Sequence, residues 1–161
     1  MTISEYNGCV ERFSDALYRF TLKSLRDSEE ARDIVQESFL RLWENRAAVI
    51  EGKEKSYLFT IAYRLLIDRV RLSKRYAGEQ ALQYRAGGIG SEYSGLDEVL
   101  SAALETLNET QRNLVLLRDY EGYSYREIGQ ITGLTESQVK VYIFRARGVL
   151  KQKIGVLEEV I

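Results

Sequence analysis

Helix start signals recur at the heads of segments with a helical apolar period, and this pattern most constrains the fold of the chain. A side-chain oxygen followed three residues later by Glu or Gln forms a capping box, which satisfies free N–H groups in the first turn of a helix. Pairs of this form, or a close variant, are Thr2–Glu5, Asp27–Glu30, Asn108–Gln111, Ser124–Glu127 and Thr135–Gln138. The chain contains no proline, the residue that interrupts helices most strongly. The sequence therefore predicts an all-α protein.

The spacing of apolar residues predicts where the helices lie. We expect helices at residues 3–25, 28–47, 54–75, 96–106, 109–120, 124–132 and 136–154. The segment between the third and fourth helices has no such period and contains five glycines and two serines. This composition is typical of a linker, and loops of this length are uncommon inside a compact domain. We therefore predict two small helical domains, residues 1–75 and 96–161, joined by a flexible linker over residues 76–95.

The counts of histidine and cysteine exclude several classes of function. The sequence has no histidine and one cysteine, Cys9. These counts rule out an internal disulfide and any catalytic device that uses histidine. They also make a Zn, Cu or haem site built on N and S ligands close to impossible. No apolar run approaches the ~18–20 residues that cross a bilayer, and the N-terminus does not resemble a signal peptide. We expect a cytoplasmic protein with no metal, cofactor or membrane insertion, and an enzyme is a distant alternative.

The net charge of −1 hides an uneven distribution of charged residues. Residues 27–44 carry six acids and two bases, a net charge of −4. Residues 53–76 carry seven bases and two acids, and residues 136–153 carry five bases and one acid. Separate acidic and basic surfaces indicate separate binding partners, although solvated helix faces would give the same pattern.

The C-terminal helices have the layout of a helix-turn-helix. Gly129 stands where two short helices cross closely, and Gly133 suits the positive φ at the end of the first helix. Ile128, Leu134 and Val139 are spaced to fill the corner between them. In this motif the second helix lies in the DNA major groove with its first residues at the base edges. Plain helix pairs with Gly in the turn are the alternative.

The second helix of this pair carries the polar and basic residues that DNA contacts require. Its first polar residues can read bases, and its cations can hold phosphates. The predicted DNA-binding residues are Thr135, Glu136, Ser137, Lys140, Arg145, Arg147 and Lys151. Tyr142 and Phe144 are excluded from this set, because aromatic residues at helical spacing are more often part of the core.

The acidic segment predicts a protein-docking surface. The stripe through Ala31, Ile34, Phe39 and Leu42 is expected to face the core. A second face combines acidic and polar residues with two large apolar side chains: Asp33, Gln36, Glu37, Leu40 and Trp43. An apolar anchor inside a charged rim is typical of a protein interface. Burial of Trp43 by another helix of the same domain is the alternative.

The first basic segment predicts a nucleic-acid surface. Charged residues recur at spacings of four, three and four on one helical face, with Lys74 beside them and Tyr57 upstream. The predicted contacts are Tyr57, Arg64, Asp68, Arg71, Lys74 and Arg75. Tyr57 and Phe59 would stack with unpaired bases, and Leu72 is expected to face the core. A solvated face with an Arg64–Asp68 pair is the alternative.

The three segments together resemble a bacterial RNA polymerase sigma factor of the extracytoplasmic-function group of the sigma-70 family. "DIVQESFLRLWE" resembles the region-two helix that docks on the clamp helices of the β′ subunit, and "YLFTIAYRLLIDRVR" resembles the −10 recognition helix. "LNETQRNLVLLRDYEGYSYREIGQITGLTESQVKVYIFRAR" resembles region four. The chain departs from the family pattern at four positions: Tyr57 stands at the usual Trp, Arg64 at the usual Asn, Asn108 at the usual Pro and Gly129 at the usual Ala.

The resemblance implies a role for each predicted surface. Residues 1–75 would be region two, residues 96–161 region four, and the linker would thread through the polymerase. The acidic face would bind core RNA polymerase, through its β′ clamp helices with the β subunit as a further partner. The first basic helix would engage the −10 element of promoter DNA, with an extruded base captured by "NRAAVIEGKEKS", and the second would read the −35 element. An anti-sigma factor is a possible further partner.

Two other classes of protein fit parts of the sequence. One is a helix-turn-helix transcriptional regulator that acts without core polymerase, and the other is a sequestering protein that makes only protein contacts. The basic helix at 54–75 distinguishes the sigma factor from the regulator, because a regulator with a C-terminal helix-turn-helix does not need it.

Overall fold

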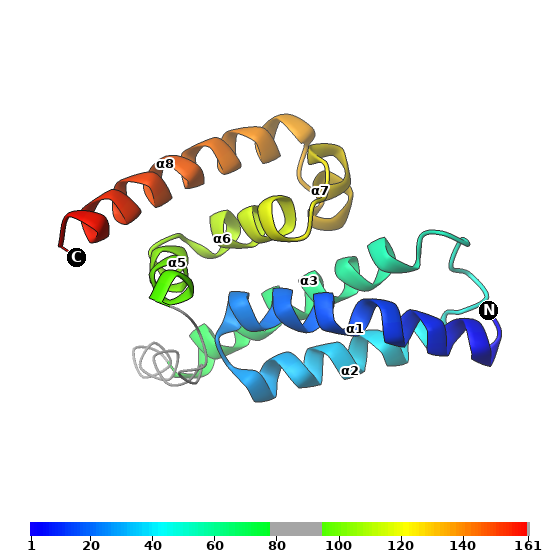
Figure 1. Cartoon of the computed structure of the whole chain (residues 1–161). Coiled ribbons are helices and arrows are strands. Elements are labelled where there is room, and N and C mark those ends of the chain that lie inside the picture. Colours follow the sequence, from blue (N-terminus) through cyan, green and yellow to red (C-terminus); the bar gives the residue numbers. More distant parts are fainter. Residues whose placement is uncertain (78–94, 161) are drawn as a thin grey trace. The chain divides into compact units, whose positions relative to one another are not determined.

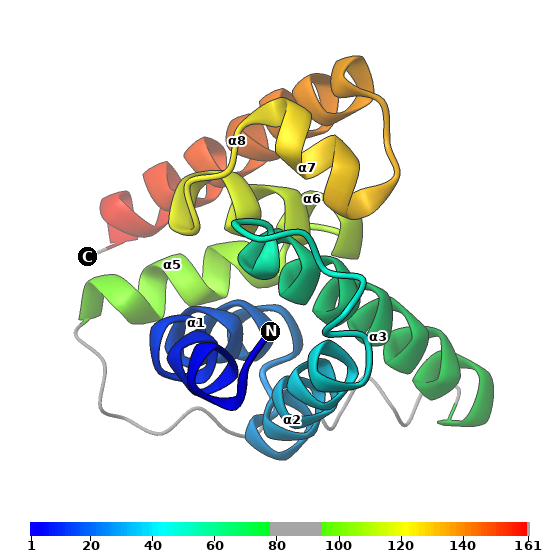
Figure 2. The ribbon, with the colours of Figure 1, turned by 90° about the vertical axis from the view of Figure 1, so that its right-hand side faces the viewer.

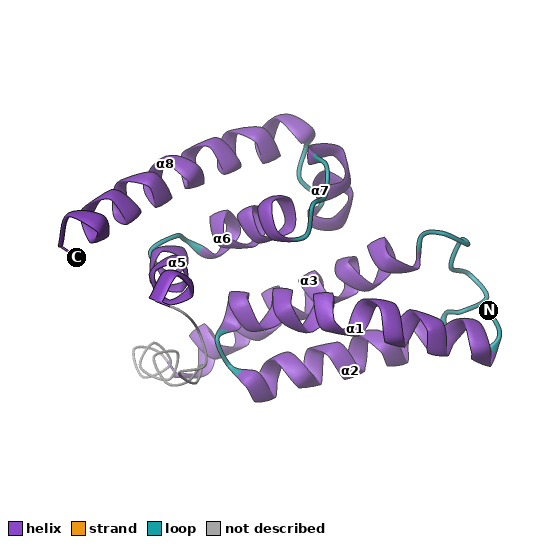
Figure 3. Cartoon of the chain, in the orientation of Figure 1, coloured by secondary structure: helices purple, strands orange, loops and turns teal. Residues whose placement is uncertain are grey.

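The structure is a computed structural model that describes residues 1–77 and 95–160, and within those ranges it contains helices and turns but no strand (Figure 3). The all-α prediction is therefore confirmed. The chain divides into two compact units, Met1–Ile89 and Gly90–Ile161. Most of the predicted linker, residues 78–94, lies outside the described residues; residues 76 and 77 belong to a helix of the first unit, and residue 95 begins the next helix. The predicted domain limits therefore stay a prediction.

The first unit is a three-helix bundle of α1 (Ile3–Leu25), α2 (Ser28–Glu44) and α3 (Glu54–Ala77). The α1 and α2 helices run antiparallel side by side, and α3 packs against both (Figures 1 and 2). Leu17, Ile34 and Leu42 are fully buried, and the rings of Phe20 and Phe59 meet with centroids 5.6 Å apart. This core holds α2 and α3 in place, so that each helix keeps one face toward solvent.

The second unit contains α5 (Gly95–Glu105), α6 (Glu109–Val115), the π-helix η1 (Leu116–Tyr120), α7 (Tyr125–Thr132) and α8 (Glu136–Val160). The α8 helix packs against α5, α6 and α7 (Figure 1). Leu114, Leu117, Ile128, Val139 and Ile143 form the centre of this core. The short connection between α7 and α8 makes the predicted helix-turn-helix corner.

Side-chain caps fix the helix starts close to where the sequence placed them. Thr2, Asn108, Ser124 and Thr135 each exchange two hydrogen bonds with the Glu or Gln three residues later. Asp27 accepts hydrogen bonds from the backbone N–H groups of Glu29 and Glu30. These bonds satisfy N–H groups that the first turn of a helix leaves free.

The largest differences from the predicted helices occur in three of them. The α2 helix ends at Glu44 rather than at residue 47, because the Asn45 amide donates to the Arg41 carbonyl and the Arg46 guanidinium donates to the Trp43 carbonyl. The predicted helix at 109–120 widens into a π-helix at Leu116, where the Glu121 N–H donates to the Leu116 carbonyl. The α8 helix continues to Val160 rather than residue 154.

Substitution of Gly129 tests whether the two helices approach closely in the helix-turn-helix corner. A Cβ atom at Gly129 would lie 2.8 Å from the carbonyl oxygen of Leu134, whereas a Cβ atom at Gly148 would meet no atom within 4 Å. We expect Gly129→Val to lower the free energy of unfolding of the second unit by about 2 kcal/mol or more, because the backbone must move to admit the side chain. Gly148→Val, the matched control in the same unit, should change it by less than about 0.5 kcal/mol.

Urea unfolding followed by far-UV circular dichroism measures both variants. Trp43, the sole tryptophan of the sequence, lies in the first unit, so its fluorescence follows that unit separately in the same samples. Equal effects of the two valines on the second unit would show that the corner is not closely packed at Gly129.

Candidate polymerase-binding and nucleic-acid interfaces

The predicted docking residues share the solvent-facing side of α2 and are called here the α2 patch: Asp33, Gln36, Glu37, Leu40 and Trp43. Leu40 is 54% exposed and lies opposite the fully buried stripe that contains Ile34 and Leu42. Asp33 and Gln36 are exposed, and Glu37 and Trp43 are half-buried. The patch thus has an accessible apolar side chain surrounded by polar ones.

Trp43 is partly covered by neighbours from two directions. The ring of Tyr6 on α1 packs edge-on against it at 5.1 Å between centroids, and the Arg46 guanidinium lies 3.9 Å over the indole. The Tyr6 hydroxyl donates a hydrogen bond to the Phe39 carbonyl at 3.0 Å. Burial raises the pKa of this hydroxyl above its ordinary value. Trp43 is therefore held by α1, and its exposed part is an edge of the α2 patch rather than its centre.

Arg69 of α3 reaches across to the carboxylates of α2. Its guanidinium lies 2.6 Å from Glu30, 3.8 Å from Asp33 and 3.7 Å from Glu37. Arg41 adds an ion pair to Glu37 at 3.1 Å. Two acids of the α2 patch therefore already have cationic neighbours within the first unit. The sequence placed Arg69 in a basic segment and gave no sign that it faces α2, because the contact joins different helices.

The charged face of α3 is open to solvent. Arg64, Asp68, Arg71, Lys74 and Arg75 are all exposed, and Tyr57 is half-buried near the start of the helix. Phe59 is fully buried against Phe20, so the expectation that it stacks with bases is wrong. The expectation that Leu72 faces the core is also wrong.

Leu72 is 50% exposed because the last turns of α3 extend past the packed part of the bundle. Every residue from 71 to 75 is exposed, whereas Leu66 and Val70, just before this segment, are buried. Helical period alone could not show where the bundle ends along α3. The cations of this final segment are consequently accessible from several directions.

The helix-turn-helix corner forms as the sequence predicted. Gly133 caps α7 with φ at 83°, and Thr135 begins α8. Ile128 and Val139 are fully buried and Leu134 is half-buried in the corner. All seven predicted DNA-binding residues are exposed: Thr135, Glu136, Ser137, Lys140, Arg145, Arg147 and Lys151. Lys140 lies 3.7 Å from Glu136, one turn earlier on the same helix.

Arg147 differs from the other cations of α8, because Asp119 of the π-helix binds it in a bidentate pair. Arg147 Nη2 lies 2.5 Å from Asp119 Oδ1, and Nε lies 3.3 Å from Oδ2. This hydrogen bond raises the pKa of the guanidinium. The pair ties α8 to the π-helix η1, while 46% of the Arg147 side chain stays accessible.

Phe144 is the functional candidate that the sequence reasoning missed. It is 80% exposed, and Val141, one turn earlier, is 46% exposed. Tyr142 is half-buried, which partly bears out its assignment to the core. The helical spacing of α8 could have predicted this exposure, because Phe144 follows Ile143 directly and so lies off the buried stripe of Val139, Ile143 and Ala146.

The described residues offer neither a metal site nor a membrane-spanning helix. Among the residues that the structure describes, no cluster of three or more Cys, Asp or Glu is placed to bind a metal ion. No helix in the described ranges is both long and apolar enough to span a bilayer. Cys9 is buried, and this burial raises the pKa of its thiol.

Comparisons with known proteins identify both units. Residues 9–76 match the family model for sigma-70 region 2, and residues 97–150 match that for sigma-70 region 4. The extracytoplasmic-function (ECF) sigma factor SigM of Bacillus subtilis is 28% identical over 94% of both chains. The ECF sigma factor SigL of Mycobacterium tuberculosis is 30% identical, over 87% of this chain and 85% of its own. The ferric citrate uptake sigma factor FecI of Escherichia coli is 32% identical, over 77% of this chain and 76% of its own.

A solved structure shows the same fold. The sigma factor RpoE of Bartonella quintana, crystallised with the anti-sigma factor NepR, matches with a TM-score of 0.79 and 23% identity, over 96% of this chain and 99% of that one. The chain therefore belongs to the extracytoplasmic-function group of the sigma-70 family of RNA polymerase sigma factors.

Proposed function

We propose that this alternative sigma factor binds core RNA polymerase through the α2 patch and selects promoters with two separate DNA surfaces, α3 for the −10 element and α8 for the −35 element. The observation that carries the proposal is that the residues assigned to these roles from the sequence lie on solvent-facing sides of their helices, while the intervening apolar residues fill the two cores. One acidic and two basic surfaces, on two regions that match the family models, support three separate contacts.

Leu40 is the proposed anchor of the polymerase contact. An accessible leucine gains most from burial when polar residues around it exclude water from the contact, and Asp33, Gln36 and Glu37 form such a rim. The clamp helices of the β′ subunit are the proposed partner of this patch, with the β subunit as a further contact. Trp43 contributes an edge whose orientation Tyr6 and Arg46 fix.

The α3 face is proposed to hold the −10 element as an opened strand. Arg64, Arg71, Lys74 and Arg75 provide cations for the phosphate backbone, and Tyr57 provides a ring on which an unpaired base can stack. Asp68 lies on the same face one turn after Arg64 and can accept hydrogen bonds from base amino groups. The preceding loop, residues 45–53, is the proposed site for an extruded base, whose unstacking costs a few kcal/mol.

The α8 helix is proposed to enter the major groove of the −35 element. Thr135, Glu136 and Ser137 stand at its N-terminus, where a recognition helix meets base edges. Lys140, Arg145 and Lys151 are exposed along the same helix and are proposed to contact phosphates. Arg147 is paired with Asp119 in the free protein, and the accessible part of its side chain is proposed to contact the phosphate backbone of the DNA.

Further partners and location follow from this role. A protein that works on polymerase and promoter acts in the cytoplasm and needs no catalytic group of its own. The Bartonella quintana sigma factor RpoE was crystallised with an anti-sigma factor, which supports an anti-sigma factor as a partner of this chain.

Transcription with purified components tests the proposal. Bacterial core RNA polymerase would be mixed with the protein and a template library whose −10 and −35 elements and spacing are randomised, and the transcribed templates would be sequenced. We expect one promoter consensus with the protein and none with core alone. Binding of the free protein to the selected promoter should be weak, because two small DNA contacts gain avidity only when polymerase holds them at the correct spacing. Tight sequence-specific binding without polymerase, with no transcription, would indicate the helix-turn-helix regulator instead.

A further inference from the structure

One ion pair links the middle of α8 to the π-helix that precedes the helix-turn-helix. Asp119 of η1 accepts hydrogen bonds from Arg147 on both carboxylate oxygens, at 2.5 and 3.3 Å. A guanidinium and a carboxylate joined by two bonds fix each other's orientation as well as their distance. The two residues are 28 positions apart in the sequence, so the pair is a tertiary contact between two elements.

The π-helix places Asp119 on the outside of the second unit, within reach of α8. From Leu116 the helix widens, and the Glu121 N–H bonds to the Leu116 carbonyl five residues earlier. Leu116 and Leu117 are fully buried in the core, whereas Asp119 is exposed. Single widened turns of this kind are often found at functional sites. The turn is therefore a reason to ask what the exposed carboxylate does.

Arg147 stands at the border of the side of α8 that packs on the second unit. At about 100° per residue, it lies roughly 40° around the helix from the buried Ile143 and roughly 20° from the exposed Lys140. It also lies about 16 Å along the helix from Glu136, the first residue of α8, at about 1.5 Å per residue. The helix-turn-helix corner fixes the start of α8, and the pair adds a hydrogen-bonded contact well beyond it.

The exposure of the pair argues against a mainly structural role. The side chains of Arg147 and Asp119 are 46% and 38% exposed. Ion pairs in such surroundings contribute little to folding, because water screens the two charges. Ile143 and Ala146, on the packed side of α8, are fully buried and hold the helix on the unit without the pair. A function in binding is therefore a better account of the pair than stability.

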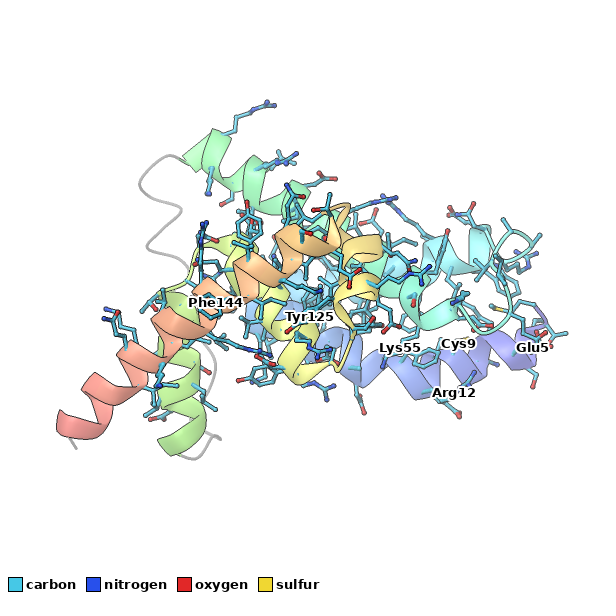
Figure 4. The ribbon with its side chains drawn as sticks, turned by 90° about the horizontal axis from the view of Figure 1, so that it is seen from above. Glu5, Cys9, Arg12, Lys55, Tyr125 and Phe144 are labelled. Atoms are coloured by element: carbon cyan, nitrogen blue, oxygen red, sulfur yellow. The ribbon has the colours of Figure 1, made fainter. Side chains whose placement is uncertain are left out.

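Asp119 is an acid among cations that come from two elements. Its neighbour Arg118 lies over the ring of Tyr125 at the start of α7, 4.4 Å from the ring centroid (Figure 4). Lys140 of α8 lies 5.8 Å from the same centroid, and Arg147 is the third cation. Such a group attracts a phosphate backbone whatever its sequence. The Asp119 carboxylate occupies Arg147 and so restrains one of the three cations.

We propose that Asp119 is a positioning residue for promoter selection, which holds the Arg147 guanidinium in one place so that it meets a phosphate only when α8 is seated in the −35 element. The inference rests on the proposed function of α8 and deepens it. Asp119 reads no base and acts through Arg147. A free arginine side chain would reach phosphates on DNA of any sequence, so the pair makes binding more selective.

Asp119→Asn tests the proposal, because the amide keeps the shape of the side chain but removes its charge and one acceptor oxygen. The affinity of the free full-length protein for duplex DNA of arbitrary sequence would be measured at several salt concentrations. We expect the variant to bind this DNA about threefold more tightly than the wild type. The slope of log affinity against log salt should steepen by about 0.9, the value for one additional phosphate contact.

Transcription by the holoenzyme measures selectivity. The selected promoter and a copy with a scrambled −35 element would compete in one reaction with limiting polymerase. We expect the ratio of the two transcripts to fall about threefold with Asp119→Asn, because the freed arginine favours both templates alike. Asp119→Glu keeps a carboxylate and should recover part of the ratio, which loss of folding would not explain.

Two further variants separate the pair from the loss of a charge. Glu98→Gln is the matched control, because Glu98 is an exposed acid on α5 of the same unit. It should leave the transcript ratio and the salt slope unchanged. In an Arg147→Ala background, Asp119→Asn should have little further effect on either quantity, since the proposed action of Asp119 passes through Arg147. Circular dichroism should show unchanged folding for every variant.

Three results would overturn the inference. They are a transcript ratio that Asp119→Asn does not change, a salt slope that stays the same, and an effect of Asp119→Asn that persists undiminished in the Arg147→Ala protein. The last would show that Asp119 repels DNA directly. In all three cases a wild-type holoenzyme that prefers its selected promoter keeps the proposed function intact. A wild-type holoenzyme without that preference would count against the proposed function itself.

Discussion

Leu40→Ala is expected to weaken binding to core RNA polymerase by about 30-fold, which corresponds to about 2 kcal/mol. The side chain is 54% exposed in the free protein, so its removal leaves the core of the first unit unchanged. In the complex it would be the apolar centre of the contact, where truncation of an anchor typically has its largest effect. The loss should appear mainly as faster dissociation.

Binding of labelled protein to core polymerase, measured by fluorescence anisotropy, gives this affinity. Leu72→Ala is the matched control, because Leu72 has the same side chain, a similar exposure and a place in the same unit, but lies on α3. We expect the control to change the affinity less than about twofold. Trp43→Ala is a poorer probe, since it also removes the contact with Tyr6. If both leucine variants bind like the wild type, the polymerase contact lies elsewhere on the protein.

Arg112→Met should lower the free energy of unfolding of the second unit by about 3 kcal/mol. Only 8% of Arg112 is exposed, and its guanidinium donates to the carbonyls of Leu104 and Leu107 at 3.1 and 3.0 Å, with Glu105 at 3.5 Å. These carbonyls end α5 and form the turn into α6. Methionine can fill the space, but it has no donor, so the carbonyls would stay buried without these hydrogen bonds.

Urea unfolding by circular dichroism measures this loss, and Trp43 fluorescence follows the first unit in the same samples. Arg126→Met is the control, because Arg126 is exposed on α7 in the same unit. It should shift the free energy of unfolding by no more than about 0.5 kcal/mol. Arg112→Lys should recover only part of the loss, since an ammonium group cannot reproduce the planar fork of donors. Comparable destabilisation by the two methionine variants would contradict a structural role for the buried guanidinium.

Local chemistry made much of the fold predictable. Each predicted capping residue begins a helix because its oxygen and the backbone N–H it satisfies are three residues apart or fewer, a distance that the sequence displays directly. The roles of Gly129 and Gly133 were also predictable, since a close approach of two helices and a positive φ each leave few alternatives to glycine. The spacing of apolar residues predicted which sides of α2 and α8 face solvent, because that spacing can also be read from the local sequence.

Contacts between helices were not predictable in this way. Tyr6 packs against Trp43, and Arg69 reaches Glu30, but nothing in their local sequence indicates the partner. The exposure of Leu72 depends on where α1 and α2 stop covering α3. Phe144 was set aside on the general tendency of aromatic residues to be buried, although its position outside the buried stripe argued against it.

The position of Arg69 changes what the acidity of α2 means for an incoming partner. Its guanidinium already neutralises part of the charge on Asp33 and Glu37, and Arg41 shares Glu37. A cationic partner therefore gains less Coulomb energy from this surface than six acids between residues 27 and 44 suggest. Association with the α2 patch should then depend only weakly on ionic strength, and its strength should come chiefly from dehydration of Leu40. The same arginine lies between Asp68 and Arg71 in the sequence of α3, so a partner that draws Asp33 and Glu37 away would leave Arg69 paired with Glu30 alone among these three acids, beside the face proposed to meet the −10 element.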